Sequence, residues 1–66
     1  MAISATERAI SDKIEVLQYF YIVNENNVDE YRLILRQAIE ANPNGNVDAI
    51  LDRVARKLID KRLGVD

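Results

Sequence analysis

The chain has 66 residues, with 9 Lys and Arg against 11 Asp and Glu, so it has room for one domain and a net charge of −2. It contains neither cysteine nor histidine, which excludes a disulfide framework, a thiolate zinc site and the commonest general base at neutral pH. An apolar share of 48% with 30% charged residues is typical of a globular chain rather than a disordered one.

The longest uninterrupted apolar run is Tyr19 to Val23. A membrane span needs about 20 apolar residues, so this run is far too short. The N-terminus has no basic region followed by an apolar core, as a secretory leader would have. We therefore expect a soluble, cytoplasmic protein without a membrane segment.

The first predicted helix covers residues 4–24. Ser4, with Glu7 three residues later, fits a capping box, in which the Ser side chain accepts from the amide of the Glu and the Glu side chain reaches back. Apolar residues then follow at helical spacing and form two stripes about a quarter turn apart. The first stripe contains Ile3, Ile10, Ile14, Leu17 and Tyr21; the second contains Ala9, Val16, Phe20 and Val23.

Two apolar stripes on one helix need two partners. Either this helix touches both of the other helices, or its second stripe meets another chain. The segment Tyr19 to Val23 consists of aromatic and β-branched residues that also suit a strand. No other segment alternates with period two, so the helix is the preferred interpretation, ending near Asn24. The residues that we expect at a protein contact here are Tyr19, Phe20 and Val23.

The second predicted helix covers residues 27–42. Asn27 and Glu30 repeat the capping-box spacing, and apolar residues from Val28 onward cover one broad arc. Leu33 departs from this arc and points to the polar side. The helix ends before Pro43, because the residue that precedes a proline is pushed out of the α region.

The third predicted helix covers residues 46–63, with Asn46 as its N-cap and Gly64 as its C-terminal cap. The three segments predict an all-α protein, a small three-helix bundle that forms a single helical domain over residues 1–66, in an antiparallel or orthogonal arrangement. The residues expected at the centre of its core are Ile14, Leu17, Leu35, Val54 and Leu58.

No cluster of unlike titratable groups marks a catalytic site, and we expect no enzyme. Asp48 and Asp52 lie one helical turn apart, but two carboxylates without a third oxygen-rich loop are weak metal ligands. The two glycines, Gly45 and Gly64, cannot form a phosphate-binding loop. The sequence therefore predicts no metal, no cofactor and no small-molecule substrate.

Charge is unevenly distributed along the chain. Residues 53–62 contain five basic residues and one acid, a net charge of +4, so the rest of the chain carries −6. Arg53, Arg56 and Lys57 share one flank of the third helix. This flank either balances the acids of the first two helices or faces an anionic partner, which would be acidic groups on a protein or a nucleic-acid backbone.

The nucleic-acid alternative has three weaknesses, one of which is that no base-stacking aromatic residue lies near the basic patch in the sequence. The chain is acidic overall, with a pI near 5.0, and a negative body repels a polyanion. The connection between the second and third helices is also somewhat longer than that of a helix-turn-helix. We therefore expect a non-enzymatic protein–protein interaction module or small regulatory protein, self-associating as a homo-oligomer or bound to a larger partner. The alternative is an accessory nucleic-acid-binding protein that uses the basic flank of the third helix.

Overall fold

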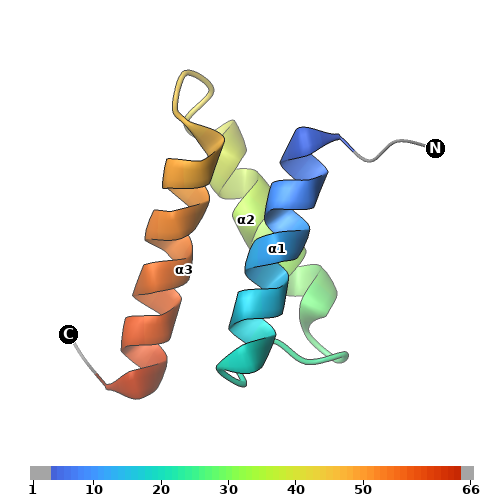
Figure 1. The fold of residues 1–66 in the computed structure, drawn as a ribbon, viewed down its shortest axis with the longest axis vertical. Helices are drawn as coiled ribbons and strands as arrows, with labels where there is room; N and C mark the ends of the chain where they lie inside the picture. The colour runs from blue at the N-terminus through green and yellow to red at the C-terminus, as the bar shows by residue number, and fades with distance from the viewer. Residues whose placement is uncertain (1–3, 65–66) are drawn as a thin grey trace.

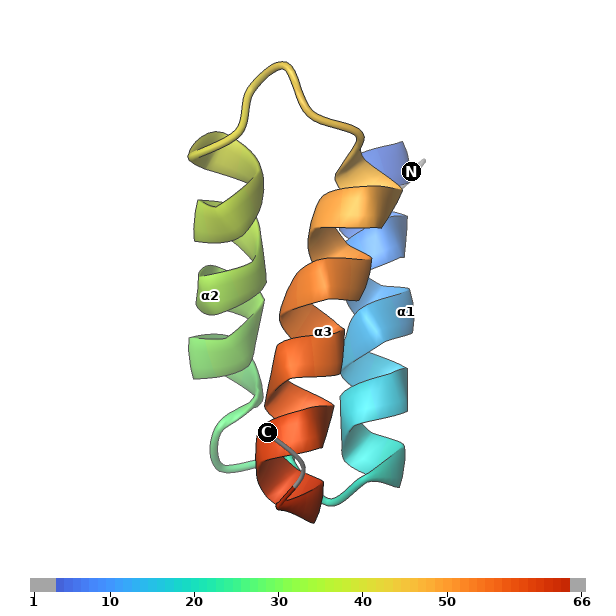
Figure 2. The ribbon, with the colours of Figure 1, turned by 90° about the vertical axis from the view of Figure 1, so that its left-hand side faces the viewer.

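The computed structural model describes residues 4–64, which form three helices and no strand. These are α1 (Ala5–Tyr19), α2 (Val28–Glu40) and α3 (Val47–Leu63). The chain runs along α1, returns along α2 and then runs along α3 in the direction of α1 (Figure 1 and Figure 2). Each helix packs against both of the others. The predicted all-α three-helix bundle is confirmed.

The expected N-caps form at Ser4 and Asn46, but the Glu7 side chain does not complete the capping box, because its carboxylate accepts from Arg36 instead. The Ser4 hydroxyl accepts a hydrogen bond from the Glu7 amide at 3.1 Å, and the Asn46 side chain accepts one from the Ala49 amide at 3.2 Å. Gly64 caps the end of α3 in the left-handed region, at φ 76°. These caps satisfy backbone groups that the helix itself leaves unpaired.

The predicted capping box at Asn27 is wrong. α2 begins at Val28, but Asn27 makes no side-chain cap. Its Oδ1 instead accepts from the Asn24 amide at 2.7 Å, and its Nδ2 donates to the Ile22 carbonyl at 3.1 Å. The side chain thus fixes the preceding loop, because asparagine bonds nearby backbone as readily as it caps a helix.

The first helix ends five residues earlier than predicted. The Tyr21 amide donates to the Gln18 carbonyl at 3.0 Å, and the Ile22 amide donates to the Leu17 carbonyl at 2.9 Å. This pair of bonds is a Schellman motif, in which the residue after the cap takes the left-handed conformation. That residue is Tyr21, at φ 61°. The turn brings Val23 back into the core, which the helix continued to Asn24 would not do.

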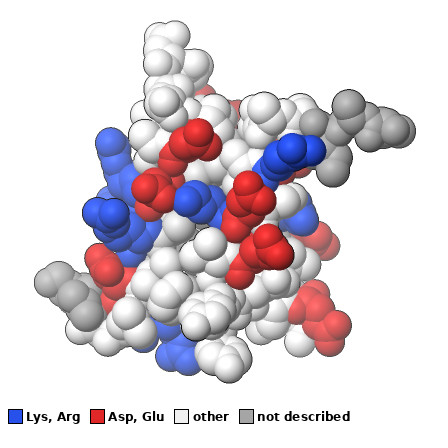
Figure 3. All heavy atoms as spheres, in the orientation of Figure 1, with Lys and Arg blue, Asp and Glu red and all other residues white. Residues whose placement is uncertain are grey.

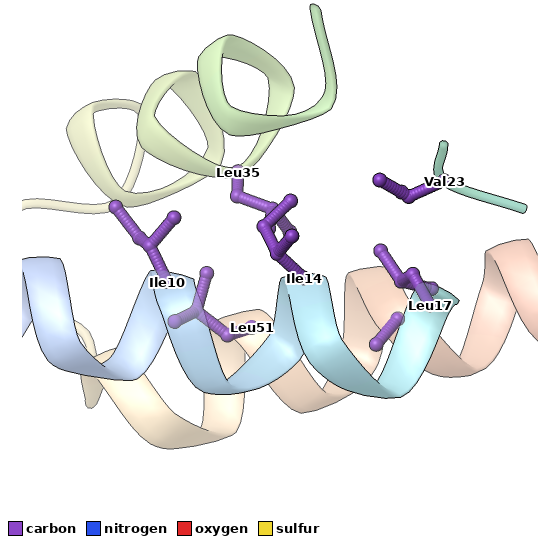
Figure 4. Close-up of a cluster of buried hydrophobic side chains, with 7 residues drawn as sticks. Ile10, Ile14, Leu17, Val23, Leu35 and Leu51 are labelled. Atoms are coloured by element: carbon purple, nitrogen blue, oxygen red, sulfur yellow. The ribbon is translucent and has the colours of Figure 1, made fainter. Parts of the chain in front are cut away.

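The core lies between the three helices (Figure 4). Ile14, Leu17 and Leu35 are buried in it, as predicted, whereas Val54 and Leu58 are only partly buried at its edge. The most buried side chains of α3 are those of Leu51 and Ala55. Leu58 lies on the same side of α3, two turns after Leu51, so it is less buried because it lies nearer the C-terminal end of the helix. Ile3, placed on the first stripe, lies outside the described residues. The buried cluster consists of Ile10, Ile14, Leu17, Val23, Leu35, Leu51 and Ala55.

Polar contacts tie α1 to both of its neighbours. Lys13 Nζ lies 2.7 Å from an Asp52 carboxylate oxygen on α3. On the other side, the Glu7 carboxylate accepts from Arg36 of α2. Exposed ion pairs of this kind contribute little to the free energy of unfolding, so they fix helix orientation more than they stabilise the bundle.

Candidate interaction surfaces

The C-terminal end of α1 carries an exposed apolar surface, here called the aromatic edge and formed by Val16, Tyr19 and Phe20. These three residues share one side of the helix because they are spaced by three and four positions. Val16 is 39% exposed and Tyr19 80% exposed, while Phe20 is half-buried. The Tyr19 and Phe20 rings meet edge to face, with centroids 5.5 Å apart and an interplanar angle of 77°.

The ring contact holds the aromatic edge in one arrangement. Edge-to-face geometry is a favourable arrangement for two aromatic rings. Figure 3 shows acidic and basic side chains mixed over the upper part of one face, and a largely uncharged region below them, toward the C-terminal ends of α1 and α3. An uncharged, partly ordered aromatic surface is of the kind that protein contacts use.

Val23 does not belong to this surface. The sequence placed Val23 with Tyr19 and Phe20 at a contact between chains, but its side chain is 4% exposed and packs into the core of its own chain. The early end of α1 is the physical reason, since the reversal at Tyr21 turns Val23 inward. Val23 is therefore not accessible to another chain in this fold.

A second surface feature lies at the same end of the bundle. An open groove of ≈ 400 Å³, here called the end groove, is lined by Tyr21, Ile22, Tyr31, Leu58, Lys61 and Arg62. Ile22, Tyr31 and Leu58 are half-buried and form its apolar floor. Lys61 and Arg62, in the last turn of α3, are exposed and supply positive charge. Tyr21 is 84% exposed.

The predicted basic flank is present on α3. Arg53, Arg56 and Lys57 are all exposed, and none of them forms a salt bridge with a carboxylate of residues 4–64. The flank is nevertheless bordered by acids, since Asp52 and Asp60 line the same shallow surface. A hydrogen bond from Lys13, with the charges of Lys13 and Arg56, lowers the pKa of Asp52, so this carboxylate stays ionised beside the flank.

The described part of the chain shows no cluster of metal ligands beside these surfaces. Residues 4–64 contain no group of three or more acidic side chains placed to hold a metal ion. None of their helices has both the length and the apolar character that crossing a bilayer requires. Within that range every buried side-chain nitrogen or oxygen has a hydrogen-bond partner.

The sequence indicated the aromatic edge but not the end groove. The apolar run Tyr19 to Val23 led us to expect Tyr19 and Phe20 at one contact, whereas the groove joins the end of α1, the first turns of α2 and the last turns of α3. The one available signal was the run Tyr19 to Val23, which suits a helix poorly.

No family model matches the chain, and neither curated proteins nor solved structures gave a significant match to it.

Proposed function

We propose that this chain is a non-enzymatic protein-interaction module that associates with a second copy of itself through the aromatic edge. The observation that carries the proposal is Tyr19, a large aromatic side chain that is 80% exposed and ordered against Phe20. Tyrosine and phenylalanine are enriched in protein interfaces, where each buries ~150–250 Å². A cytoplasmic location stays a prediction from the sequence.

Self-association fits the chemistry of this surface. A two-fold contact places the same patch of both subunits face to face. The three residues of the aromatic edge are uncharged, although the exposed acids Asp12 and Glu15 border it one turn earlier on α1. The basic flank would meet its own copy with three positive charges on each side, so the aromatic edge is the better candidate for a two-fold contact. A chain of 66 residues without disulfides also has a small core, and association is a usual way to bury more apolar surface.

Sedimentation equilibrium over a wide concentration range tests the proposal. The wild type should show a concentration-dependent rise in mass toward the dimer. Tyr19→Glu should remain monomeric with unchanged helix content, because a charge at a desolvated contact is costly while an exposed side chain contributes little to folding. Leu33→Glu is the matched control, since Leu33 is also exposed, at 53%, but lies on α2 away from the edge.

A wild type that stays monomeric at every concentration would overturn self-association. If the wild type is monomeric but binds another protein, and this binding is lost in Tyr19→Glu, the aromatic edge would be assigned to a larger partner. Phe20→Glu is less informative than Tyr19→Glu, because Phe20 is half-buried and its substitution also disturbs the fold.

The second candidate function is accessory binding of nucleic acid through the basic flank. The exposed positions of Arg53, Arg56 and Lys57, without ion pairs to described carboxylates, favour it. The neighbouring Asp52 and Asp60 oppose it, since they lower the local positive potential. A salt-dependent gel shift against random duplex tests this function, and reversing the three basic residues to Glu should abolish the shift while helix content is retained.

A further inference from the structure

We propose that the end groove binds a short acidic peptide segment of a partner protein, with an apolar side chain on the floor and a carboxylate against Lys61 and Arg62. This inference goes beyond the proposed self-association, because it names the chemistry of a further partner. It concerns a surface other than the aromatic edge. The two can therefore be tested by different measurements.

The floor of the groove matches an apolar side chain. Ile22, Tyr31 and Leu58 pack against the core on one side and line the groove on the other. Each is half-buried, so part of its apolar surface remains in contact with solvent. The volume of ≈ 400 Å³ lies at the lower end of the ~300–1,000 Å³ of usual ligand pockets, which suits one or two side chains.

The positive side chains of the groove favour an acidic ligand. Lys61 and Arg62 form no salt bridge with a carboxylate of residues 4–64. They lie at the C-terminal end of α3, where the helix dipole contributes the equivalent of about −0.5 charge. The two positive side chains outweigh the partial negative charge of the helix end, and no acidic residue lines the groove. The lining therefore carries a net positive charge on a chain that is otherwise acidic. Arginine in particular binds a carboxylate through two parallel hydrogen bonds.

The same features favour a peptide over a nucleic acid. A phosphate backbone is bound through a row of basic side chains, and the groove supplies only two. The acidic remainder of the chain also repels a long polyanion more than it repels a short segment with one or two carboxylates.

Tyr21 supplies an independent reason to assign a ligand to this groove. It occupies the left-handed position of the Schellman motif, at φ 61°, where glycine or asparagine fits without steric conflict. Its side chain is 84% exposed, so burial does not compensate the unfavourable backbone conformation. Neither backbone preference nor burial therefore explains a tyrosine at this position. A ring at the mouth of the groove can instead cover a bound apolar side chain.

Panning of a random peptide library displayed on phage against the folded, full-length chain tests the inference, followed by titration with the enriched synthetic peptides. Enriched sequences should combine Asp or Glu with a large apolar residue, and their binding should weaken as salt rises. The double variant Lys61→Gln/Arg62→Gln should lose about tenfold or more in affinity, because the charge-assisted hydrogen bonds are removed. Glutamine preserves the helix.

Arg8→Glu is the matched control. It changes the net charge by the same amount as the double glutamine variant, but Arg8 lies in the first turns of α1, at the opposite end of the bundle (Figure 1). Its affinity for the enriched peptides should equal that of the wild type. A second variant, Tyr21→Gly, should bind the peptides more weakly while its melting temperature rises, and a merely structural tyrosine would not show this opposite change.

Three outcomes would overturn the inference. The first is a selection that enriches no acidic peptides. The second is peptide affinity that survives in Lys61→Gln/Arg62→Gln. The third is displacement of the peptides by random duplex or by phosphatidylserine vesicles, which would assign the groove to a polyanion or an anionic lipid surface. A monomeric wild type that still binds the peptides contradicts only the aromatic edge, and a dimer that binds none contradicts only the groove.

Discussion

Two sides of α1 carry apolar residues, but the bundle buries only one of these sides. Ile10, Ile14 and Leu17 are almost fully buried between α2 and α3 (Figure 4). Val16 and Tyr19, one or two positions from Leu17, stay exposed. Burial therefore depends on which neighbours the chain itself supplies, and the two other helices supply enough to cover one side of α1.

This difference separates stability from interaction. Side chains on the buried side contribute through removal of apolar surface from water, at roughly 25 cal/mol per Å². Side chains on the exposed side gain nothing comparable until another chain covers them. Substitutions on the two sides should consequently affect different properties, namely the free energy of unfolding on one side and the mass in solution on the other.

The largest contrast is expected between Leu17→Ala and Tyr19→Ala. Removal of the fully buried Leu17 side chain should lower the free energy of unfolding by about 2–5 kcal/mol, because it leaves a cavity. Tyr19→Ala should change it by less than about 0.5 kcal/mol at concentrations where the chain is monomeric. Urea unfolding followed by circular dichroism measures both. Equal losses would mean that the buried and exposed sides are wrongly distinguished.

A smaller contrast is expected along α3. Leu51 is fully buried, whereas Leu58 is half-buried at the groove. Leu51→Ala should destabilise the bundle by about 2–5 kcal/mol, and Leu58→Ala by roughly 1 kcal/mol, since less apolar surface is lost and no closed cavity forms. The measurement is again denaturant unfolding. If Leu58→Ala proved the more damaging of the two, the core would have to lie nearer the C-terminal end of α3.

Tyr21→Gly should stabilise the protein by about 0.5–1 kcal/mol, because glycine adopts the left-handed conformation without strain and this outweighs its larger entropy in the unfolded chain. Tyr21→Ala, which keeps the strain and removes the ring, is the matched comparison and should gain nothing. Thermal melts of the three proteins check the order. A loss of stability in the glycine variant would show that the Tyr21 ring supports the fold.

The smallest effect concerns the ion pair between α1 and α3. The hydrogen bond and charge of Lys13 lower the pKa of Asp52 in the folded state, so this pair stabilises the fold above the ordinary carboxyl pKa. Its contribution disappears as the pH falls through the lowered pKa. Lys13→Met should therefore make stability less dependent on pH in the acid range, below about pH 4. Acid titrations of the two proteins that superimpose would show that the pair is not formed in solution.

Much of this fold was predictable from local signals. Helical spacing identified three helices and buried positions such as Ile14 and Leu35, and the caps at Ser4, Asn46 and Gly64 follow from short-range hydrogen bonding. The smaller burial of Leu58 was not predictable, because Leu51 and Leu58 lie on the same side of α3, two turns apart, and only tertiary packing shows which turns the other helices cover.

The end of α1 shows a second limit. The left-handed position after a helix is usually taken by glycine or asparagine, whereas here it is Tyr21, so no residue in the segment predicted the turn. That turn decides the candidate sites as well, since it moves Val23 into the core and brings Tyr21 and Ile22 to the groove. The aromatic edge was accessible to sequence reasoning, whereas the groove depends on contacts between distant segments.

The most direct test of the central claim is to locate the association surface by recording amide NMR spectra of the wild type at increasing protein concentration. Concentration-dependent shifts are expected to gather at Val16, Tyr19 and Phe20 and to vanish in Tyr19→Glu. Residues 53–57 on the basic flank should stay unchanged. Shifts that gather on that flank, or spectra that do not change at any concentration, would contradict the claim that the exposed side of α1 is covered by a second copy.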